Sequence, residues 1–379
     1  MKKIVIIGAN DFQNPLILKA KDNGYETHVF AWKDGSIGEK TADFFYPISI
    51  IEKEQILKEC KKIKPDAVIS IGSDLAMITV NFLAKELGLV GNTLECTTNS
   101  TNKYAMRKAF KKAGVKVPEF EEITENESIE KLNYLTFPLI VKPTDRSGSR
   151  AITKVLKKED LKEAIKRAIS NSFEKKAIIE EYIDGQEYSL ECISYKGQHN
   201  FLTITKKYTT GAPHFIETAH IEPAGLNEEQ QEKVKKVIFK ALDALGIENG
   251  ASHSEFRIDS KGDVRIIEIG ARMGGDCIGS DLVQISTGYD FLQMVLDVSL
   301  GKKPNFNKIS IPKIAIIKFI FGKKELEELE TIKRENPEWI WFVSNIDEID
   351  SHDIIDSSTR YGFYILAVDS KDKIKNILE

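Results

Sequence analysis

The chain has 379 residues, of which 41% are hydrophobic and 30% are charged, and its 54 Lys and Arg residues nearly balance its 58 Asp and Glu residues. The apolar fraction is too high for a disordered chain, and the net charge of −4 argues against a nucleic-acid-binding protein, which usually has a basic domain. No apolar run reaches the roughly 18 residues of a membrane span. A single core stops growing at roughly 250–300 residues, so we expect two or three packed subdomains.

The first hundred residues alternate between predicted strands and helices. An apolar run at residues 3–7 ends in Gly8 and is followed by Asn10 and Asp11, which favours a buried strand over a signal peptide. A helix, a strand, a helix, a strand and a helix are then predicted over residues 14–23, 27–31, 52–64, 67–71 and 75–87. This α/β rhythm predicts a parallel sheet with helices on both faces.

From residue 102 the pattern changes to a strand-rich α+β region. Helices are predicted over residues 103–113, 159–170 and 228–245. Strands are predicted over residues 139–142, 151–155, 178–182, 187–195, 198–207, 252–258 and 264–269, with hairpin turns at Lys196-Gly197 and Lys261-Gly262. Strands at 314–321 and 363–368 flank a charged helix at 323–334 and a loop near Asn336, which predicts a small C-terminal α+β subdomain from residue 302.

The four cysteines lie far apart and form no CxxC pair or Cys/His cluster. We therefore expect reduced thiols in a cytoplasmic protein. The loop Gly8-Ala9-Asn10 follows the first strand but lacks the second and third glycines of the dinucleotide fingerprint, so we exclude a nicotinamide enzyme.

A lysine and a small-residue loop suggest a phosphate site. Lys142 ends a buried strand, and Ser147, Gly148 and Ser149 follow five to seven residues later. Backbone N–H groups of such a loop can close over phosphates. Taken alone, a Ser-Gly-Ser sequence is more often a simple hairpin turn.

The order of the surrounding features is more specific than any one of them. Lys103 opens a helix upstream, an acidic stretch runs from Glu180 to Glu187, and Glu255 and Glu268 lie on the two strands of one hairpin. This series resembles the ATP-grasp superfamily over the whole chain. The resemblance implies a parallel-sheet pre-ATP-grasp domain at residues 1–100, an ATP-grasp domain at 101–301 and a C-terminal subdomain at 302–379.

The resemblance also implies a role for each matching position. Lys103 and Lys142 would contact the ATP phosphates, under the loop of Ser147, Gly148 and Ser149. Glu180 and the backbone of Tyr182 and Ile183 would hold adenine, and Glu187 would hold the ribose. Glu255 and Glu268 would hold magnesium, or manganese in its place. Magnesium prefers such hard oxygen ligands, and a cation between facing acids would relieve their repulsion.

One position departs from the family pattern. Many ATP-grasp enzymes read Glu-x-Asn where this chain reads Glu268-Ile269-Gly270, and Gly270 has no side chain to bind a metal. A water ligand can take that place, because magnesium tolerates water well. Because of this departure, the sequence does not decide whether a second metal ion binds. A second hypothesis also remains, that the protein is a non-catalytic regulatory protein that binds a nucleotide.

Three further stretches resemble the amino-acid ligases of the superfamily. His253 stands two residues before Glu255, a polar segment contains Glu217 and His220, and Arg272 opens a loop with Gly274 and Gly275. The resemblance implies that Arg272 binds a substrate carboxylate or acyl phosphate, that Glu217, His220 and the two glycines lie near the substrate, and that His253 and Glu268 complete the catalytic set. Structural roles for the two histidines, and an ion-pair role for Arg272, remain open.

These features together predict a carboxylate–amine ligase. ATP would activate a carboxylate, expected to be that of an amino acid, as an acyl phosphate, and an amine would displace phosphate. Its partners would be these small molecules, with neither nucleic acid nor membrane, and the resemblance suggests a homodimer. The alternative is a purine-pathway ATP-grasp enzyme acting on a phosphoribosyl amine, although the loops at residues 8–11 and 72–74 are not basic.

Overall fold

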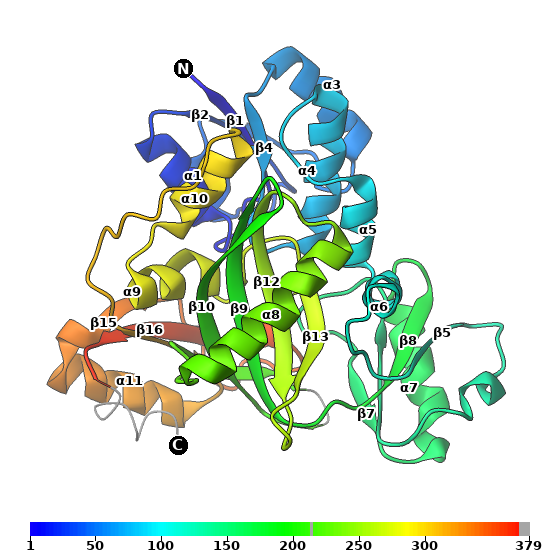
Figure 1. The fold of residues 1–379 in the computed structure, drawn as a ribbon. Coiled ribbons are helices and arrows are strands. Elements are labelled where there is room, and N and C mark those ends of the chain that lie inside the picture. Colours follow the sequence, from blue (N-terminus) through cyan, green and yellow to red (C-terminus); the bar gives the residue numbers. More distant parts are fainter. Residues whose placement is uncertain (213–214, 371–379) are drawn as a thin grey trace.

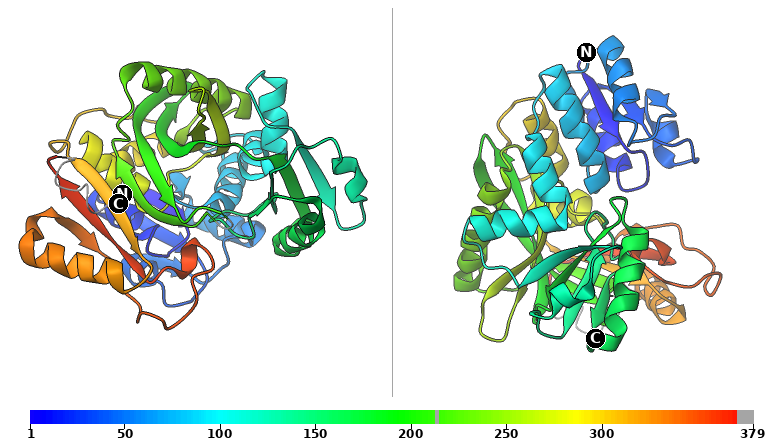
Figure 2. Two further views of the ribbon diagram at one scale, coloured as in Figure 1. Left: turned by 90° about the horizontal axis from the view of Figure 1, so that it is seen from below. Right: turned by 90° about the vertical axis from the view of Figure 1, so that its right-hand side faces the viewer.

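The computed structural model describes residues 1–212 and 215–370, so residues 371–379 of the expected C-terminal subdomain lie outside it. An N-terminal α/β layer lies against a large antiparallel sheet, and a smaller antiparallel sheet stands beside the large one (Figures 1 and 2). The expected combination of a parallel-sheet domain with α+β regions is confirmed. Within the described ranges, no helix combines the length and the apolar character needed to cross a membrane.

The N-terminal layer is a parallel sheet in the order β3-β2-β1-β4. Its strands are β1 (Lys3–Ile7), β2 (Glu26–Phe30), β3 (Phe44–Tyr46) and β4 (Ala67–Ile69). Its helices are α1 (Asn14–Asp22), α2 (Ile37–Thr41), α3 (Lys53–Ile63), α4 (Asp74–Leu87) and α5 (Leu94–Thr101). Alternate residues of β1 enter two different cores, because successive side chains of a strand point to opposite faces.

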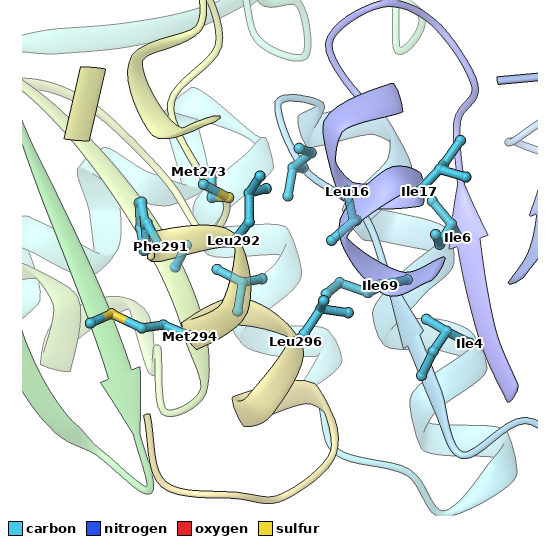
Figure 3. Packing of buried hydrophobic residues seen from close by; sticks show 14 of the residues in the cluster. Ile4, Ile6, Leu16, Ile17, Ile69, Met273, Phe291, Leu292, Met294 and Leu296 are labelled. Atoms are coloured by element: carbon cyan, nitrogen blue, oxygen red, sulfur yellow. The ribbon is translucent and has the colours of Figure 1, made fainter. Parts of the chain in front are cut away.

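One face of this sheet is covered partly by a helix from much later in the chain. The helix α10 (Phe291–Ser299) places Leu292 and Leu296 in the same buried cluster as Leu16 of α1 and Ile69 of β4 (Figure 3). The N-terminal layer therefore packs against the rest of the molecule through a shared apolar core.

The smaller sheet has the order β5-β8-β6-β7 and is antiparallel. It contains β5 (Phe120–Thr124), β6 (Leu139–Pro143), β7 (Thr153–Val155) and β8 (Lys176–Glu181), with η1 (Ile129–Leu132) and α7 (Lys158–Asn171). The amphipathic helix α7 buries one apolar stripe against the sheet. The helix α6 (Lys103–Lys112) connects this lobe to the N-terminal layer.

The large sheet has eight strands in the order β13-β12-β9-β10-β11-β14-β16-β15. The strands are β9 (Gln186–Tyr195), β10 (Gln198–Thr209), β11 (Glu217–Glu222), β12 (Gly250–Ile258), β13 (Val264–Gly270), β14 (Ile314–Ile320), β15 (Ile340–Val343) and β16 (Gly362–Val368). The remaining helices are α8 (Glu228–Leu245), η2 (Ile278–Leu282), α9 (Val283–Thr287), α11 (Lys323–Glu335), η3 (Pro337–Trp339) and η4 (Ser357–Thr359). A capping box at Asn227 and Gln230 begins α8, and Gly246 ends it at φ 76°.

The strands after residue 302 do not form a sheet of their own. β14 pairs with β11, with Ile317 opposite His220, so the last strands extend the large sheet. The expected loop near Asn336 contains η3 and leads into β15. The strand expected over residues 151–155 is the shorter β7.

Candidate active site

A cleft opens between the two antiparallel sheets, and most of the expected site residues line it. Those that line it are Lys103, Lys142, Ser147, Gly148, Ser149, Glu180, Tyr182, Ile183, Glu187, Glu217, His253, Glu255, Glu268 and Arg272. His220, Gly274 and Gly275 do not line it. The structure thus brings together side chains that lie far apart in the sequence, from Lys103 to Arg272.

Lys142 is held by a buried ion-pair network. Its Nζ lies 2.5 Å from Oε1 of Glu180, whose Oε2 accepts a hydrogen bond of 2.8 Å from Nε of Arg107. Burial alone would raise the pKa of the Glu180 carboxyl, but the charges of Arg107 and Lys142 lower it to about 2. The Glu180 side chain, expected at the adenine, therefore orients Lys142 in this structure.

Sequence reasoning missed Arg107. It stands four residues after Lys103 on α6, so both side chains lie on one helix face, and this spacing was the available signal. Arg107 also donates from Nη2 to the carbonyl oxygen of Ile267 at 2.8 Å, which joins α6 to β13.

Lys103 joins three segments around the cleft. Its Nζ donates to the carbonyl oxygen of Arg146 at 2.6 Å and to Oε1 of Glu268 at 2.8 Å. The Asn102 side chain caps α6 and sets the direction of its first turn. The ammonium therefore lies between the loop after β6 and an expected metal carboxylate.

Glu255 and Glu268 face each other across the β12–β13 ladder, and a β-bulge follows Glu255. Each carboxylate is already paired, Glu268 with Lys103 at 2.8 Å and Glu255 with Lys207 at 2.5 Å. Among the described residues, no three Asp, Glu, His or Cys side chains converge on a position that could hold a metal ion. Two carboxylates fit magnesium when phosphates and water supply its other ligands.

Lys207 was not found from the sequence, where nothing distinguishes it from its neighbour Lys206. It is 4% exposed, and its Nζ also lies 3.8 Å from both Glu187 and Glu217. Burial opposes its charge, but Glu255, Glu217 and Glu187 raise the pKa of Lys207 well above its ordinary value. A permanent cation thus lies behind three acids that line the cleft.

His253 is a buried cation beside Glu255. Its Nδ1 contacts Oε1 of Glu191, and its Nε2 lies 3.3 Å from Oε1 of Glu255. Burial would lower the pKa of the imidazole, but Glu191 and Glu255 raise it to about 9. Gly274 supports this arrangement from behind, because its N–H donates to Glu191 at 3.0 Å and a Cβ there would lie 2.9 Å from Nδ1 of His253.

Arg272 is bound to the N-terminal layer. Its Nε and Nη2 each donate to a different oxygen of Asp74 at 2.9 Å, so the fork expected to hold a substrate carboxylate is occupied by Asp74. This pair also explains Gly270, because a Cβ at that position would lie 2.7 Å from Oδ1 of Asp74 and 3.1 Å from Cζ of Arg272. The usual Asn does not fit beside the pair.

The far end of the cleft is aromatic and apolar. The rings of Tyr182 and Phe215 lie 6.2 Å apart at an interplanar angle of 26°, and Nζ of Lys154 lies 3.5 Å from the Tyr182 centroid. Ile140, Ile152 and Ile267 also line the cleft. Flat, partly apolar walls of this kind suit a planar base.

Arg257, also missed, secures this end. Its Nη1 donates to the carbonyl oxygen of Ile183 at 2.6 Å, and its Nη2 donates to Oε2 of Glu187 at 2.9 Å. One guanidinium therefore holds both the carbonyl group of Ile183, expected near adenine, and Glu187, the acid expected to bind ribose. The Tyr182 N–H donates to the carbonyl oxygen of Pro138 at 2.9 Å.

The loop after β6 lines the cleft and touches two other segments. Gly148 and Ser149 have φ values of 72° and 57°, in the left-handed region. The Ser149 hydroxyl donates to the carbonyl oxygen of Phe215 at 3.4 Å, and Arg150 lies 3.8 Å from Asp356. These contacts hold the loop at the border of the cleft.

The expected substrate residues separate into two groups. Glu217 lines the cleft and accepts a hydrogen bond of 2.5 Å from Ser357. His220 is fully buried outside it, where Nε2 lies 3.4 Å from Asp276, which Arg360 binds through both carboxylate oxygens. Burial lowers the pKa of His220. In this structure His220 therefore contacts Asp276 and not the cleft.

A Ser–His–Asp series occurs elsewhere, at Ser194, His199 and Asp243. Ser194 is a fully buried residue of β9, opposite His199 of β10, so its hydroxyl meets no substrate. The series stabilises the hairpin.

Known proteins resemble this chain in sequence and in fold. Residues 135–281 match a family model described as the ATP-grasp domain. The chain is 29% identical over 301 residues to the alanine–anticapsin ligase of Bacillus subtilis (strain 168), a match that covers 70% of this chain and 63% of that protein. The chain therefore spans a little under two thirds of this relative's length. It is also 24% identical to the carbamoyl phosphate synthase large chain of Thermotoga neapolitana, over 79% of this chain and 29% of that protein.

Solved structures share the fold over the whole chain. An L-amino acid ligase from Bacillus licheniformis superposes with a TM-score of 0.84 at 24% identity, covering 100% of this chain and 96% of that one. A phosphoribosylglycinamide synthetase from Anaerococcus prevotii superposes with a TM-score of 0.77 at 23% identity, again covering 100% and 96%. At these identities the likeness establishes the fold alone.

Proposed function

Since residues 135–281 form an ATP-grasp domain, we propose that the protein is an ATP-dependent carboxylate–amine ligase that joins an amino acid to an amine. The observation that carries this proposal is the cleft itself. It combines a base-sized aromatic end, two buried lysines at Lys103 and Lys142, and the facing carboxylates Glu255 and Glu268. The similarity to an alanine–anticapsin ligase supports the choice of an amino acid as substrate.

The residues around the phosphates supply positive charge and position. Magnesium, which Glu255 and Glu268 would hold, would supply positive charge against the charge that develops during phosphoryl transfer. Lys103 and Lys142 would hold phosphate oxygens, and the loop of Ser147, Gly148 and Ser149 would exclude water from the acyl phosphate. No side chain needs to form a covalent bond with the substrate.

The residues next to the metal carboxylates would act on the substrate. The substrate carboxylate attacks the γ-phosphorus, ADP leaves, and the amine then attacks the acyl carbon and expels phosphate. Arg272 and protonated His253 lie at this end of the cleft and would stabilise the oxyanion. Asp74 already binds Nε and Nη2 of Arg272. A substrate carboxylate would therefore either bind the same guanidinium together with Asp74 or displace Asp74.

Release of ADP and phosphate in the presence of candidate substrates tests this function. The protein should be incubated with ATP and magnesium and with amino acids, singly and in all pairs, and products identified by mass spectrometry. We expect release that depends on a pair and a product equal to the two acids minus water. Glu268→Gln should abolish this signal, with Glu248→Gln, on the loop before β12, as a matched control.

Two outcomes would support other functions. Release stimulated only by a phosphoribosyl amine with formate or bicarbonate would contradict the ligase and favour the purine-pathway reading. ATP binding without release under any of these conditions would favour a regulatory nucleotide-binding protein.

A further inference from the structure

A short turn near the end of the chain contacts three segments, each of which contributes a residue to the lining of the cleft. The turn consists of η4 (Ser357–Thr359) with its flanking residues Asp356 and Arg360, and it lies between β15 and β16 of the large sheet. Its partners are Arg150 after β6, Glu217 of β11 and Asp276 after β13. The part of the chain that was expected to form a separate subdomain therefore supplies contacts at the cleft.

Arg360 anchors this turn to the large sheet. Its Nη1 and Nη2 donate to the two carboxylate oxygens of Asp276 at 3.1 and 2.6 Å, and its guanidinium lies 3.5 Å from the centroid of the Phe319 ring. The Arg360 side chain is 6% exposed, so these contacts are shielded from water. The hydroxyl of Ser357 donates to Oε2 of Glu217 at 2.5 Å. The turn is thus a fixed part of the large-sheet side of the cleft.

The two carboxylate oxygens of Asp356 have different partners. Oδ1 accepts hydrogen bonds from the N–H and the hydroxyl of Ser358 at 2.8 and 2.6 Å, which caps η4. Oδ2 lies 3.8 Å from Nε of Arg150, in the loop after β6. Among the described residues, the Arg150 side chain has no other ion pair and no hydrogen bond. The turn thus fixes the Asp356 carboxylate, and the second oxygen faces the loop of the small-sheet lobe.

We propose that Asp356 is a positioning residue, which acts through Arg150 to hold the loop after β6 across the cleft until the amine has attacked the acyl phosphate. This inference rests on the proposed ligase reaction. Arg150 lines the cleft and Asp356 does not, so any effect of Asp356 on the reaction is indirect. The pair also links the small-sheet lobe to the large sheet. When the pair is broken, the loop opens more often, and water hydrolyses the acyl phosphate to the amino acid and phosphate.

Amide hydrogen exchange of the loop, followed by mass spectrometry, tests the pairing without turnover. In Asp356→Asn the peptide over residues 144–152 should exchange about two- to fivefold faster than in the wild type, as expected for a partly exposed ion pair. Asn caps a helix as well as Asp does, so the substitution removes the charge and keeps the turn. Arg150→Gln should give the same increase, and the double variant should give no further increase.

The release of ADP without product tests the role of the pair in the reaction. With a pair of amino acids that the wild type joins, ADP released in excess of product should increase about two- to fivefold in Asp356→Asn and in Arg150→Gln. Arg150→Lys, which keeps the charge, should stay close to the wild type. Lys162→Gln, at an exposed position of α7 in the same lobe, is the control and should match the wild type in both measurements.

Three results would overturn the proposal. The first is loop exchange in Asp356→Asn at the wild-type rate. The second is a double variant in which the two effects add, because the side chains then act independently. The third is faster loop exchange with no additional uncoupled ADP, because the pair would then hold the loop without affecting the reaction. A wild type that forms no product with any pair of amino acids would count against the proposed function alone, since the exchange measurement needs no substrate.

Discussion

Several buried charges among the described residues form opposed pairs, and Arg107 belongs to one of the most buried of them. It is 1% exposed and helps to neutralise Glu180, which in turn holds Lys142. Removing one partner of a buried pair leaves a charge without full compensation. Single residues of this kind therefore link stability to the placement of Lys142, for which we propose contact with phosphate.

Arg107→Met should lower the free energy of unfolding by about 3 kcal/mol. It should also raise the KM for ATP, because Glu180, the partner of Lys142, is no longer held in place by Arg107. Urea denaturation and ATP titration check the two effects. Lys108→Met, the exposed neighbour on α6, is the control and should change neither. A variant as stable as the wild type would contradict the inferred pairing.

Glu222 predicts a pH dependence of stability. It is fully buried between the hydroxyls of Thr205 and Ser286, and burial raises its pKa to about 8. Since the folded state keeps a proton that the unfolded state releases above about pH 4.5, Glu222 lowers stability as pH rises toward 8, by up to about 1.4 kcal/mol per pH unit.

Glu222→Gln should remove this loss. The variant and the wild type should differ little near pH 4.5, and the variant should become progressively more stable up to pH 8. Denaturation curves across this range are the measurement. A difference in stability that does not vary with pH would show that Glu222 titrates normally.

The site residues that were predictable are those that stand in an ordered motif. Lys142, Glu255 and Glu268 occur in the order expected for the ATP-grasp superfamily, and all three line one cleft. Lys207 and Arg257 were missed, because a partner 48 or 70 residues away leaves no local pattern. The Asp74–Arg272 pair, which spans 198 residues, could not be inferred for the same reason.

At the scale of elements, strands with a regular pattern and helices with clear ends were predictable. β1, β9 and α8 lie close to their expected ranges. β11 was described only as a polar segment, because its burial comes from neighbours on both sides in the large sheet. α10 was missed although it is strongly apolar, since its partner surface is the N-terminal sheet.

The loop after β6 gives a prediction at this scale. Gly148→Ala should raise the KM for ATP about tenfold, because an L-residue at φ 72° is strained and the loop would move away from the phosphates. A Cβ there meets nothing within 4 Å, so any effect is conformational.

Gly197→Ala is the matched control for that loop. Gly197 has a φ of 76°, its Cβ would also meet nothing within 4 Å, and it lies in the β9–β10 hairpin turn. It should lose similar stability with an unchanged KM for ATP. Equal KM values in both variants and the wild type would argue against a covering role for the loop.

At the scale of the whole molecule, the cleft is closed by contacts between separate layers. The Asp74–Arg272 pair joins α4 of the N-terminal layer to the end of β13, and α10 joins the same layer through apolar packing. The end of the cleft at Arg272 is therefore an interface between layers, where ligand sites are commonly found.

Gly270→Asn tests this interface. The new side chain would overlap the Asp74–Arg272 pair, so the free energy of unfolding should fall by about 1–3 kcal/mol. In an Asp74→Ala background, Gly270→Asn should lower the free energy of unfolding by less, because the Asp74 carboxylate no longer overlaps the new side chain. A double-mutant cycle by urea denaturation measures the coupling. Equal costs in both backgrounds would mean that Asp74 does not exclude the side chain.

In the proposed reaction, ATP activates a substrate carboxylate before an amine attacks it. Once a substrate pair is known, the amino acid can be labelled with ¹⁸O in its carboxylate, and the released phosphate analysed by mass spectrometry. An acyl phosphate route transfers one carboxylate oxygen to phosphate, because the bond from carbon to that oxygen breaks when the amine attacks. We predict one ¹⁸O atom in each phosphate released, and unlabelled phosphate would contradict the account.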